Sequence, residues 1–332
     1  MTAVRISSSI VDHVSPLHDL SAETLGGSAS EYLLSISARE RAWNKKFAKP
    51  RRREFFFSRS KEPIEPEDHL RLLDDFDKVV PYICPDTDDC VSILRHPDLR
   101  LENVFVDPTD FKITAIIDWQ GTSALPFFKQ TGYPHFLSNN GEGVSRVMEL
   151  DKLPGNFDSL DAGEKEELKY QHIRRLSCQL YLRSSGKYNF RHFKALSRRV
   201  NAVRAELIKR VGLPWDGDLV MLRSSLLDII EFWRDFANDK PCPLKYSTTD
   251  IEQWKEEEKE WSEASDSLAA FRQDLGSNEE GWIPTELYED SFRRNQYLRW
   301  KISETAEEEL RNEVWKAWPF KDDDDLSDWK EK

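Results

Sequence analysis

Residues 96–119, HPDLRLENVFVDPTDFKITAIIDW, decide the fold of this 332-residue chain. Two short runs rich in β-branched residues, 104–106 and 113–117, flank the turn sequence Asp-Pro-Thr-Asp. Proline presets φ in such a turn, and the aspartates can bond the nearby backbone. The stretch therefore predicts a loop, an antiparallel hairpin and a second loop.

Four polar residues lie at the open end of this predicted hairpin: His96, Asp98, Asn103 and Asp118. Pairing of the two strands brings Asp118 back beside Asn103. Two acids and an amide suit Mg²⁺, which prefers oxygen ligands and keeps waters and substrate phosphates. None of these residues alone indicates a function. A histidine in a loop usually forms structural hydrogen bonds, and Asp or Asn in a turn usually caps a nearby backbone N–H. The order His-x-Asp-x₄-Asn, hairpin, Asp is specific, because it matches the catalytic order of protein kinases.

Composition sets the broad class of protein. Hydrophobic residues make up 39% of the chain and aromatic residues 11%, which is enough for a sizeable core and argues against wholesale disorder. The net charge of -13 disfavours nucleic acid as a partner. The four cysteines form no CxxC pair, so neither zinc nor a disulfide framework is indicated. No apolar run approaches the roughly 20 residues that span a bilayer, and the N-terminus is a weak match to a transit peptide.

The rest of the chain is predicted to be mainly helical. Residues 1–28 show no sustained period and are expected to be irregular, whereas 30–47 and 63–83 carry helical apolar spacing. Residues 321–332 are expected to form an acidic tail. Beyond residue 150, helices are predicted at 161–184, 189–211, 218–238, 249–274 and 284–317. The predicted fold class is therefore α+β, mainly α, with one small antiparallel hairpin that carries the site.

The segment 96–128 resembles the catalytic segment of the aminoglycoside phosphotransferase/choline kinase-like family and, within it, the fungal group called altered inheritance of mitochondria protein 9. The resemblance continues through EYLLSISARERAWNKKF, GWIPTELYED and AWPF, and so covers about residues 25–320. It implies that residues 29–320 form a protein-kinase-like C-terminal lobe with a helical subdomain. It also implies ATP- and Mg²⁺-dependent phosphoryl transfer to the hydroxyl of a small molecule, and a mitochondrial location in place of a cytoplasmic one.

The resemblance assigns a role to each site residue. Asp98 would be the catalytic base, and His96 would hold the catalytic loop in shape. Asn103 and Asp118 would be the Mg²⁺ ligands. The remaining two positions are expected at the nucleotide: Trp119 stands where protein kinases have the Phe of DFG, and Arg100 lies two residues after the base. Arg100 replaces an expected histidine, so a phosphate contact and a solvent-exposed arginine both stay open.

A kinase of this kind also has an N-terminal lobe with a phosphate-covering loop and a strand lysine paired to a helix glutamate. The 95 residues before His96 show neither, since they are predicted to be helices and loops. Three hypotheses follow: a phosphotransferase whose N-terminal lobe is absent from this chain, a non-catalytic kinase-like binding or scaffolding protein, or a structural loop in an unrelated helical protein. Aminoglycoside, choline, sugar and protein hydroxyls all stay open as acceptors, and nothing indicates the oligomeric state.

Overall fold

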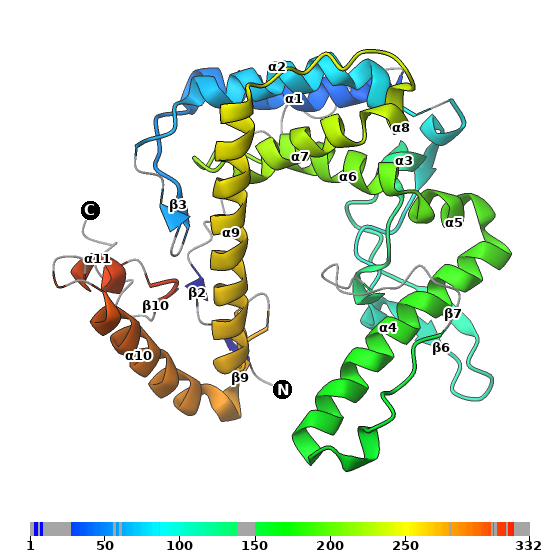
Figure 1. The fold of residues 1–332 in the computed structure, drawn as a ribbon. Helices are drawn as coiled ribbons and strands as arrows, with labels where there is room; N and C mark the ends of the chain where they lie inside the picture. Colours follow the sequence, from blue (N-terminus) through cyan, green and yellow to red (C-terminus); the bar gives the residue numbers. More distant parts are fainter. Residues whose placement is uncertain are drawn as a thin grey trace.

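The computed structural model describes residues 3–5, 7–8, 28–55, 58–59, 62–85, 87–137, 150–278, 281–306, 308, 311–316 and 318–321. This part of the chain is mainly helical, with small antiparallel sheets of two strands each (Figure 1). The predicted coarse fold class, α+β and mainly α, is therefore confirmed. Among the described residues, no helix has both the length and the hydropathy needed to cross a membrane.

The helices are α1 (Ala29–Phe47), α2 (Pro66–Ile83), α3 (Phe127–Gln130), α4 (Ala162–Tyr188), α5 (Phe190–Ser197), α6 (Arg199–Val211), α7 (Val220–Glu231), α8 (Trp233–Ala237), α9 (Thr248–Asp274), α10 (Tyr288–Thr305) and α11 (Arg311–Lys316). The strands are β1 (Ala3–Arg5), β2 (Ser7–Ser8), β3 (Glu54–Phe55), β4 (Ser58–Arg59), β5 (Ser92–Leu94), β6 (Val104–Val106), β7 (Ile113–Ile116), β8 (Ala124–Pro126), β9 (Trp282–Pro284) and β10 (Phe320–Lys321). The strand pairs are β1–β9, β2–β10, β3–β4, β5–β8 and β6–β7.

The helices begin where the sequence supplies capping residues. Ser28 and Glu31 form a reciprocal capping box at the start of α1, which satisfies backbone N–H groups that the helix itself cannot pair. Pro66 opens α2, where its missing N–H costs nothing. Both helices occupy the segments predicted from the apolar spacing.

One main core joins α1, α2, α6, α7 and α8. In Figure 1, α1 and α2 lie side by side above α6 and α7. Leu33, Phe76, Leu207 and Leu226 are fully buried in this core. Burial of each such side chain contributes about 1.5–3 kcal/mol relative to leaving it exposed, so the apolar stripes of the helices fix the scaffold.

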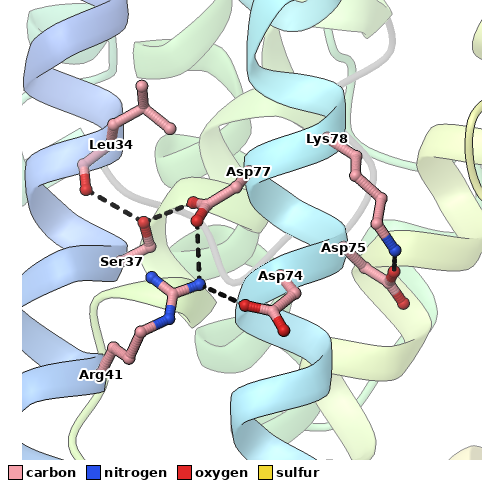
Figure 2. A network of polar contacts seen from close by, with 7 residues as sticks. All are labelled: Leu34, Ser37, Arg41, Asp74, Asp75, Asp77 and Lys78. Carbon is pink, nitrogen blue, oxygen red and sulfur yellow. Dashed lines mark hydrogen bonds and ion pairs between the residues drawn. The ribbon is translucent and has the colours of Figure 1, made fainter.

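A polar network crosses the interface between α1 and α2 (Figure 2). Arg41 Nη2 lies 2.8 Å from Asp77 Oδ2 and 2.6 Å from Asp74 Oδ1. Ser37 Oγ lies 2.5 Å from the other oxygen of Asp77. The Asp77 carboxylate is thus held on both oxygens by α1, which sets the register between the two helices.

Three segments that were each predicted to form one continuous helix are interrupted in the structure. The segment 189–211 is broken at Arg198, whose extended backbone ends α5 and starts α6. The segment 218–238 is broken at Phe232, between α7 and α8. The segment 284–317 divides into α10 and α11 and starts at the end of β9. Helical spacing continues across a corner when both helices bury a face, so local periodicity did not reveal these breaks.

The ends of the described chain meet in a second, smaller cluster. Long helix α9 leads away from the α1–α2 layer towards α10 (Figure 1). Leu275, Ile283, Trp318 and Phe320 form a buried cluster there. Strands β1 and β2 pair with β9 and β10, although they lie within the segment 1–28 that was predicted to be irregular. Of the predicted acidic tail, residues 322–332 lie outside the described residues.

Candidate functional site

The site lies on an excursion of the chain that is closed at its base. Strand β5 leads into the excursion and pairs antiparallel with β8, which leads out of it. Arg95, immediately after β5, donates hydrogen bonds to the backbone carbonyls of Gln130 and Tyr133. Residues 95–123 therefore extend from a fixed base, and Figure 1 shows their hairpin at the right, away from α1 and α2.

The predicted hairpin is confirmed. Strands β6 and β7 pair antiparallel, with Val104 opposite Ile116, and the backbone N–H of Ile117 donates to Asn103 O at 3.0 Å. Asn103 and Asp118 therefore come to the same end of the hairpin, as the sequence predicts. At the opposite end, Asp107 Oδ1 accepts the Thr109 N–H at 2.7 Å and stabilises the turn.

His96 ties the loop before the hairpin to the strand end after it. Its Nε2 lies 2.7 Å from the Ile117 carbonyl oxygen, which can only accept, so Nε2 carries the hydrogen. Nδ1 is then free to accept the Asp98 N–H at 3.3 Å. The ring is buried and packs edge-on against Trp119, with 4.8 Å between the ring centroids. This arrangement fixes Asp98 relative to the end of β7.

Asp98 and Asn103 are joined through the loop backbone. Asn103 Nδ2 donates to Asp98 O at 2.9 Å, so the amide donor is used inside the loop and Oδ1 is the atom suited to meet a cation. The Asp98 carboxylate accepts from Arg100 Nε at 2.8 Å, and both side chains are more than two-fifths exposed. An ion pair this exposed contributes little to stability, so a competing anion could separate it easily.

Asp118 has an unusual backbone conformation. Its φ is +64°, in the left-handed region that non-glycine residues adopt only rarely. Such strain persists when neighbouring structure imposes it, and it is concentrated at functional sites. Here the following Trp119 is held in place, because its Nε1 donates to Ile116 O at 2.9 Å. The strained turn carries the exposed Asp118 past the strand end, on the side of Asn103.

Asn103 and Asp118 are the residues at this end of the hairpin whose oxygens could contribute to a Mg²⁺ site. Asn103 and Asp118 supply two kinds of hard oxygen ligand, and Mg²⁺ usually takes its remaining ligands from water and substrate phosphate. Within the described ranges, no group of three or more His, Cys, Asp or Glu side chains could hold a metal ion unaided. The donor set is thus suited to a metal–nucleotide complex more than to a resident ion.

A cavity of about 400 Å³ adjoins the loop, and sequence reasoning missed it. His96, Pro97 and Leu99 line one side of it, next to Asp98. Its other side comes from late helices: Tyr181 Oη of α4 lies 3.0 Å from His192 Nε2 of α5. Burial and the nearby Arg95 lower the pKa of His192. No local motif marks these residues, because only the fold brings α4 and α5 to the loop.

A second feature that the sequence did not reveal is an exposed apolar surface around the hairpin. The hairpin side chains point largely to solvent, in contrast to the usual pattern of a strand with one buried face. The large apolar residues at least one-third exposed there are Leu101, Phe105, Val106, Phe111, Ile113, Ile116, Ile117 and Trp119. Large exposed apolar patches on soluble proteins are typical of interaction sites.

No family model matches the chain, and no solved structure matches it. It is similar to a subtelomeric hrmA-associated cluster protein of Aspergillus fumigatus, with 30% identity over 305 residues that cover 91% of this chain and 60% of that protein. It is also similar to altered inheritance of mitochondria protein 9 of Lachancea thermotolerans, with 24% identity over 63% of this chain and 33% of that protein. The Saccharomyces cerevisiae protein of the same name is 26% identical over 59% of this chain and 30% of that protein. The chain thus spans no more than about 60% of the length of these fungal relatives, and the expected resemblance to altered inheritance of mitochondria protein 9 is confirmed.

Proposed function

We propose that this chain carries the catalytic and metal-binding part of a kinase-like phosphotransferase, which transfers a phosphoryl group from ATP to the hydroxyl of a small molecule. One observation carries the proposal: the hairpin register and the His96 contacts gather Asp98, Asn103 and Asp118 at one end of the hairpin. Because the relatives are longer, the activity of a whole protein of this type is part of the proposal.

In this proposal Asp98 orients the acceptor and takes its proton. The acceptor oxygen bonds to the γ-phosphorus as the bond from that phosphorus to the β–γ bridging oxygen breaks, and ADP leaves. Asn103 Oδ1 and the Asp118 carboxylate would hold Mg²⁺, which neutralises phosphate charge. His96 keeps the loop closed against β7, so Asp98 stays aligned through its backbone. Positioning of this kind supplies most of the catalysis in phosphoryl transfer.

Arg100 and Trp119 are proposed to contact the nucleotide. The Arg100 guanidinium already binds a carboxylate, and a phosphate offers it a similar but more highly charged partner. Movement of Arg100 to phosphate would release the Asp98 carboxylate for the acceptor hydroxyl. Trp119 presents an indole face that is 49% exposed beside Asp118, which is suitable for apolar contact. The acceptor would enter from the cavity that His96 and Leu99 line.

A non-catalytic kinase-like binding or scaffolding protein is the second candidate. The observation that favours it is the Asp98–Arg100 ion pair, because Arg100 occupies the carboxylate that would have to face an acceptor hydroxyl. The exposed apolar hairpin would then be a docking face and not part of a reaction site. Both candidates use the same kinase-like lobe, which the helical fold and the hairpin support.

We also propose a mitochondrial location, with the cytoplasm as the alternative. The proposal rests on relatives whose names carry the word mitochondrial. Fractionation of fungal cells that produce the tagged protein tests it, and recovery in the cytosolic fraction alone would reject it.

Calorimetric titration of the purified chain with Mg²⁺ and ATP tests the function. Asp118→Asn is expected to weaken binding at least about tenfold, because one charge-assisted contact contributes about 1.5–3 kcal/mol. Asp110→Asn is the matched control, since it makes the same change in the turn at the far end of the hairpin. In a longer protein of this type, which supplies the remaining phosphate contacts, Asp98→Asn should keep the binding and abolish phosphoryl transfer.

The outcomes separate the two candidates. Binding that needs Asp118, with transfer that needs Asp98, supports the phosphotransferase. Binding by such a longer protein without any transfer to a panel of aminoglycosides, choline and sugars supports the scaffolding protein. Equal binding by wild type and Asp118→Asn would reject the proposed metal ligand.

A further inference from the structure

Most of α4, together with α5 and α6, is strongly basic in an otherwise acidic chain. Residues 168–210 contain twelve Lys and Arg residues and one acidic residue, Glu206, whereas the whole chain has a net charge of -13. Charges are screened over about 8 Å at physiological salt. The potential near these helices is therefore set by the local cations and not by the acidic remainder of the chain.

The bend at Arg198, between α5 and α6, brings basic side chains of this stretch together around a hollow. Arg191 and Lys194 lie three residues apart on α5 and so share one face, and Arg198 stands at the corner between α5 and α6. The three cations line a cavity of about 380 Å³ together with Asn201 and Asp89. Figure 1 shows α5 at the right edge of the molecule, between α4 and α6. An unbroken helix over 189–211 would spread these side chains along one rod.

The basic side chains of the hollow are not all neutralised by acidic partners. Arg191 is held in place, because its guanidinium lies over the Phe127 ring and 3.8 Å from Asp89 Oδ1. In contrast, no ion pair joins the side chain of Lys194 or Arg198 to an acidic group of the described residues. Asp89 is the one acid among the lining residues, so it cannot neutralise three cations.

The N-terminus of α6 adjoins the same hollow, since Arg198 and Asn201 both line it. Arg198 is the N-cap of the 13-residue helix α6, and its side chain makes no capping hydrogen bond. The helix dipole adds partial positive charge at that end. Asn201 is fixed nearby, since its Nδ2 donates to Ala195 O at 2.9 Å and its Oδ1 accepts from Arg204 Nη1 at 2.7 Å. The hollow thus combines three basic side chains with the N-terminus of a helix.

We propose that this hollow binds a phosphate group, carried either by a soluble phosphate ester or by a lipid headgroup. Its size and its three cations suit a dianion that accepts several charge-assisted hydrogen bonds. The inference does not depend on the proposed phosphotransferase, because none of these residues belongs to the hairpin site. A lipid source is tested separately, because two exposed aromatic side chains that could contact a lipid surface lie near the hollow, where α4 meets α5: Tyr188 is 77% exposed and Phe190 is 66% exposed.

The test compares two double variants of equal charge. Lys194→Gln/Arg198→Gln removes two cations of the hollow, and Lys169→Gln/Lys209→Gln removes two from elsewhere in the same basic stretch. All four side chains are exposed, so both variants should fold. The probes are glycerol 3-phosphate, measured by calorimetry, and phosphatidylcholine vesicles with or without phosphatidic acid, measured by flotation.

Wild type is expected to bind a phosphate probe saturably. The hollow variant should bind it at least about tenfold more weakly, since each charge-assisted contact contributes about 1.5–3 kcal/mol, and the control variant should stay within about twofold. Binding of glycerol 3-phosphate identifies a soluble source, and binding of phosphatidic acid vesicles alone identifies a lipid source. Absence of binding to every probe, or equal losses in the two variants, would overturn the site.

Discussion

Replacement of His96 should loosen the loop that carries Asp98 without unfolding the rest of the chain. The imidazole joins two backbone groups that lie 19 residues apart in the sequence: it donates to Ile117 O at 2.7 Å and accepts from Asp98 N–H at 3.3 Å. His96→Leu removes both bonds and leaves a carbonyl and an N–H without partners. His96→Gln retains an amide N–H that can still reach the Ile117 carbonyl.

The magnitude follows from the burial of the groups left behind. An unpaired buried polar group costs about 1–3 kcal/mol. Ile117 is 46% exposed, so water can partly replace the lost donor, and the 3.3 Å bond is near the long limit for N–H donors. We therefore expect His96→Leu to destabilise the hairpin base by about 1–2 kcal/mol, which corresponds to roughly 5- to 30-fold faster local opening.

Hydrogen exchange of backbone amides measures this opening directly. The Ile117 N–H, which donates to Asn103 O, should exchange faster in His96→Leu, with an intermediate rate in His96→Gln. The amides of α2 serve as the internal reference, because they belong to the main core. Unchanged exchange at Ile117 in His96→Leu would refute the role given to this histidine, as would an equal acceleration throughout α2.

Two predictions concern the scaffold. Arg41→Met should lower the free energy of unfolding, measured in urea, by about 1–2 kcal/mol, because it leaves the Asp77 carboxylate without its charged partner. The control Arg71→Met removes an exposed ion pair and should lower that free energy by less than about 0.5 kcal/mol. Equal losses in the two variants would contradict this account. Burial lowers the pKa of His69 from 6.5 to about 4, and Asn44 Nδ2 lies 3.1 Å from its Nδ1. The unfolded state therefore binds more protons between these pH values, so stability should fall by up to about 3 kcal/mol as pH drops from 6.5 to 4. His69→Gln should flatten this part of the pH profile, and an unchanged profile would contradict the assignment.

Local features of the site could be predicted from the sequence. The hairpin follows from two β-prone runs and a turn, and its pairing alone brings Asp118 to Asn103. The role expected for His96 came from the family resemblance, and its ring contacts the carbonyl of Ile117, 21 residues further along the chain. Helices α1 and α2 likewise carry their caps and apolar stripes within their own segments.

The features that depend on distant contacts could not be predicted. Strand β1 pairs with β9, which lies more than 270 residues away, and no local pattern encodes that partner. The cavity beside His96 needs Tyr181 and His192 from helices whose relative placement only packing decides. The corner at Arg198 was missed because apolar spacing persists through it, although this corner creates the basic hollow.

Paramagnetic broadening by Mn²⁺ tests the central claim most directly, because it reports which side chain lies beside the metal. We predict that substoichiometric Mn²⁺ with ATP broadens the side-chain amide signal of Asn103 and spares that of Asn295, which is buried in the second cluster with Trp318. In Asp118→Asn the Asn103 signal should persist. An Asn103 signal that stays sharp while ATP is bound, or that is broadened equally in Asp118→Asn, would contradict a metal–nucleotide site at this end of the hairpin.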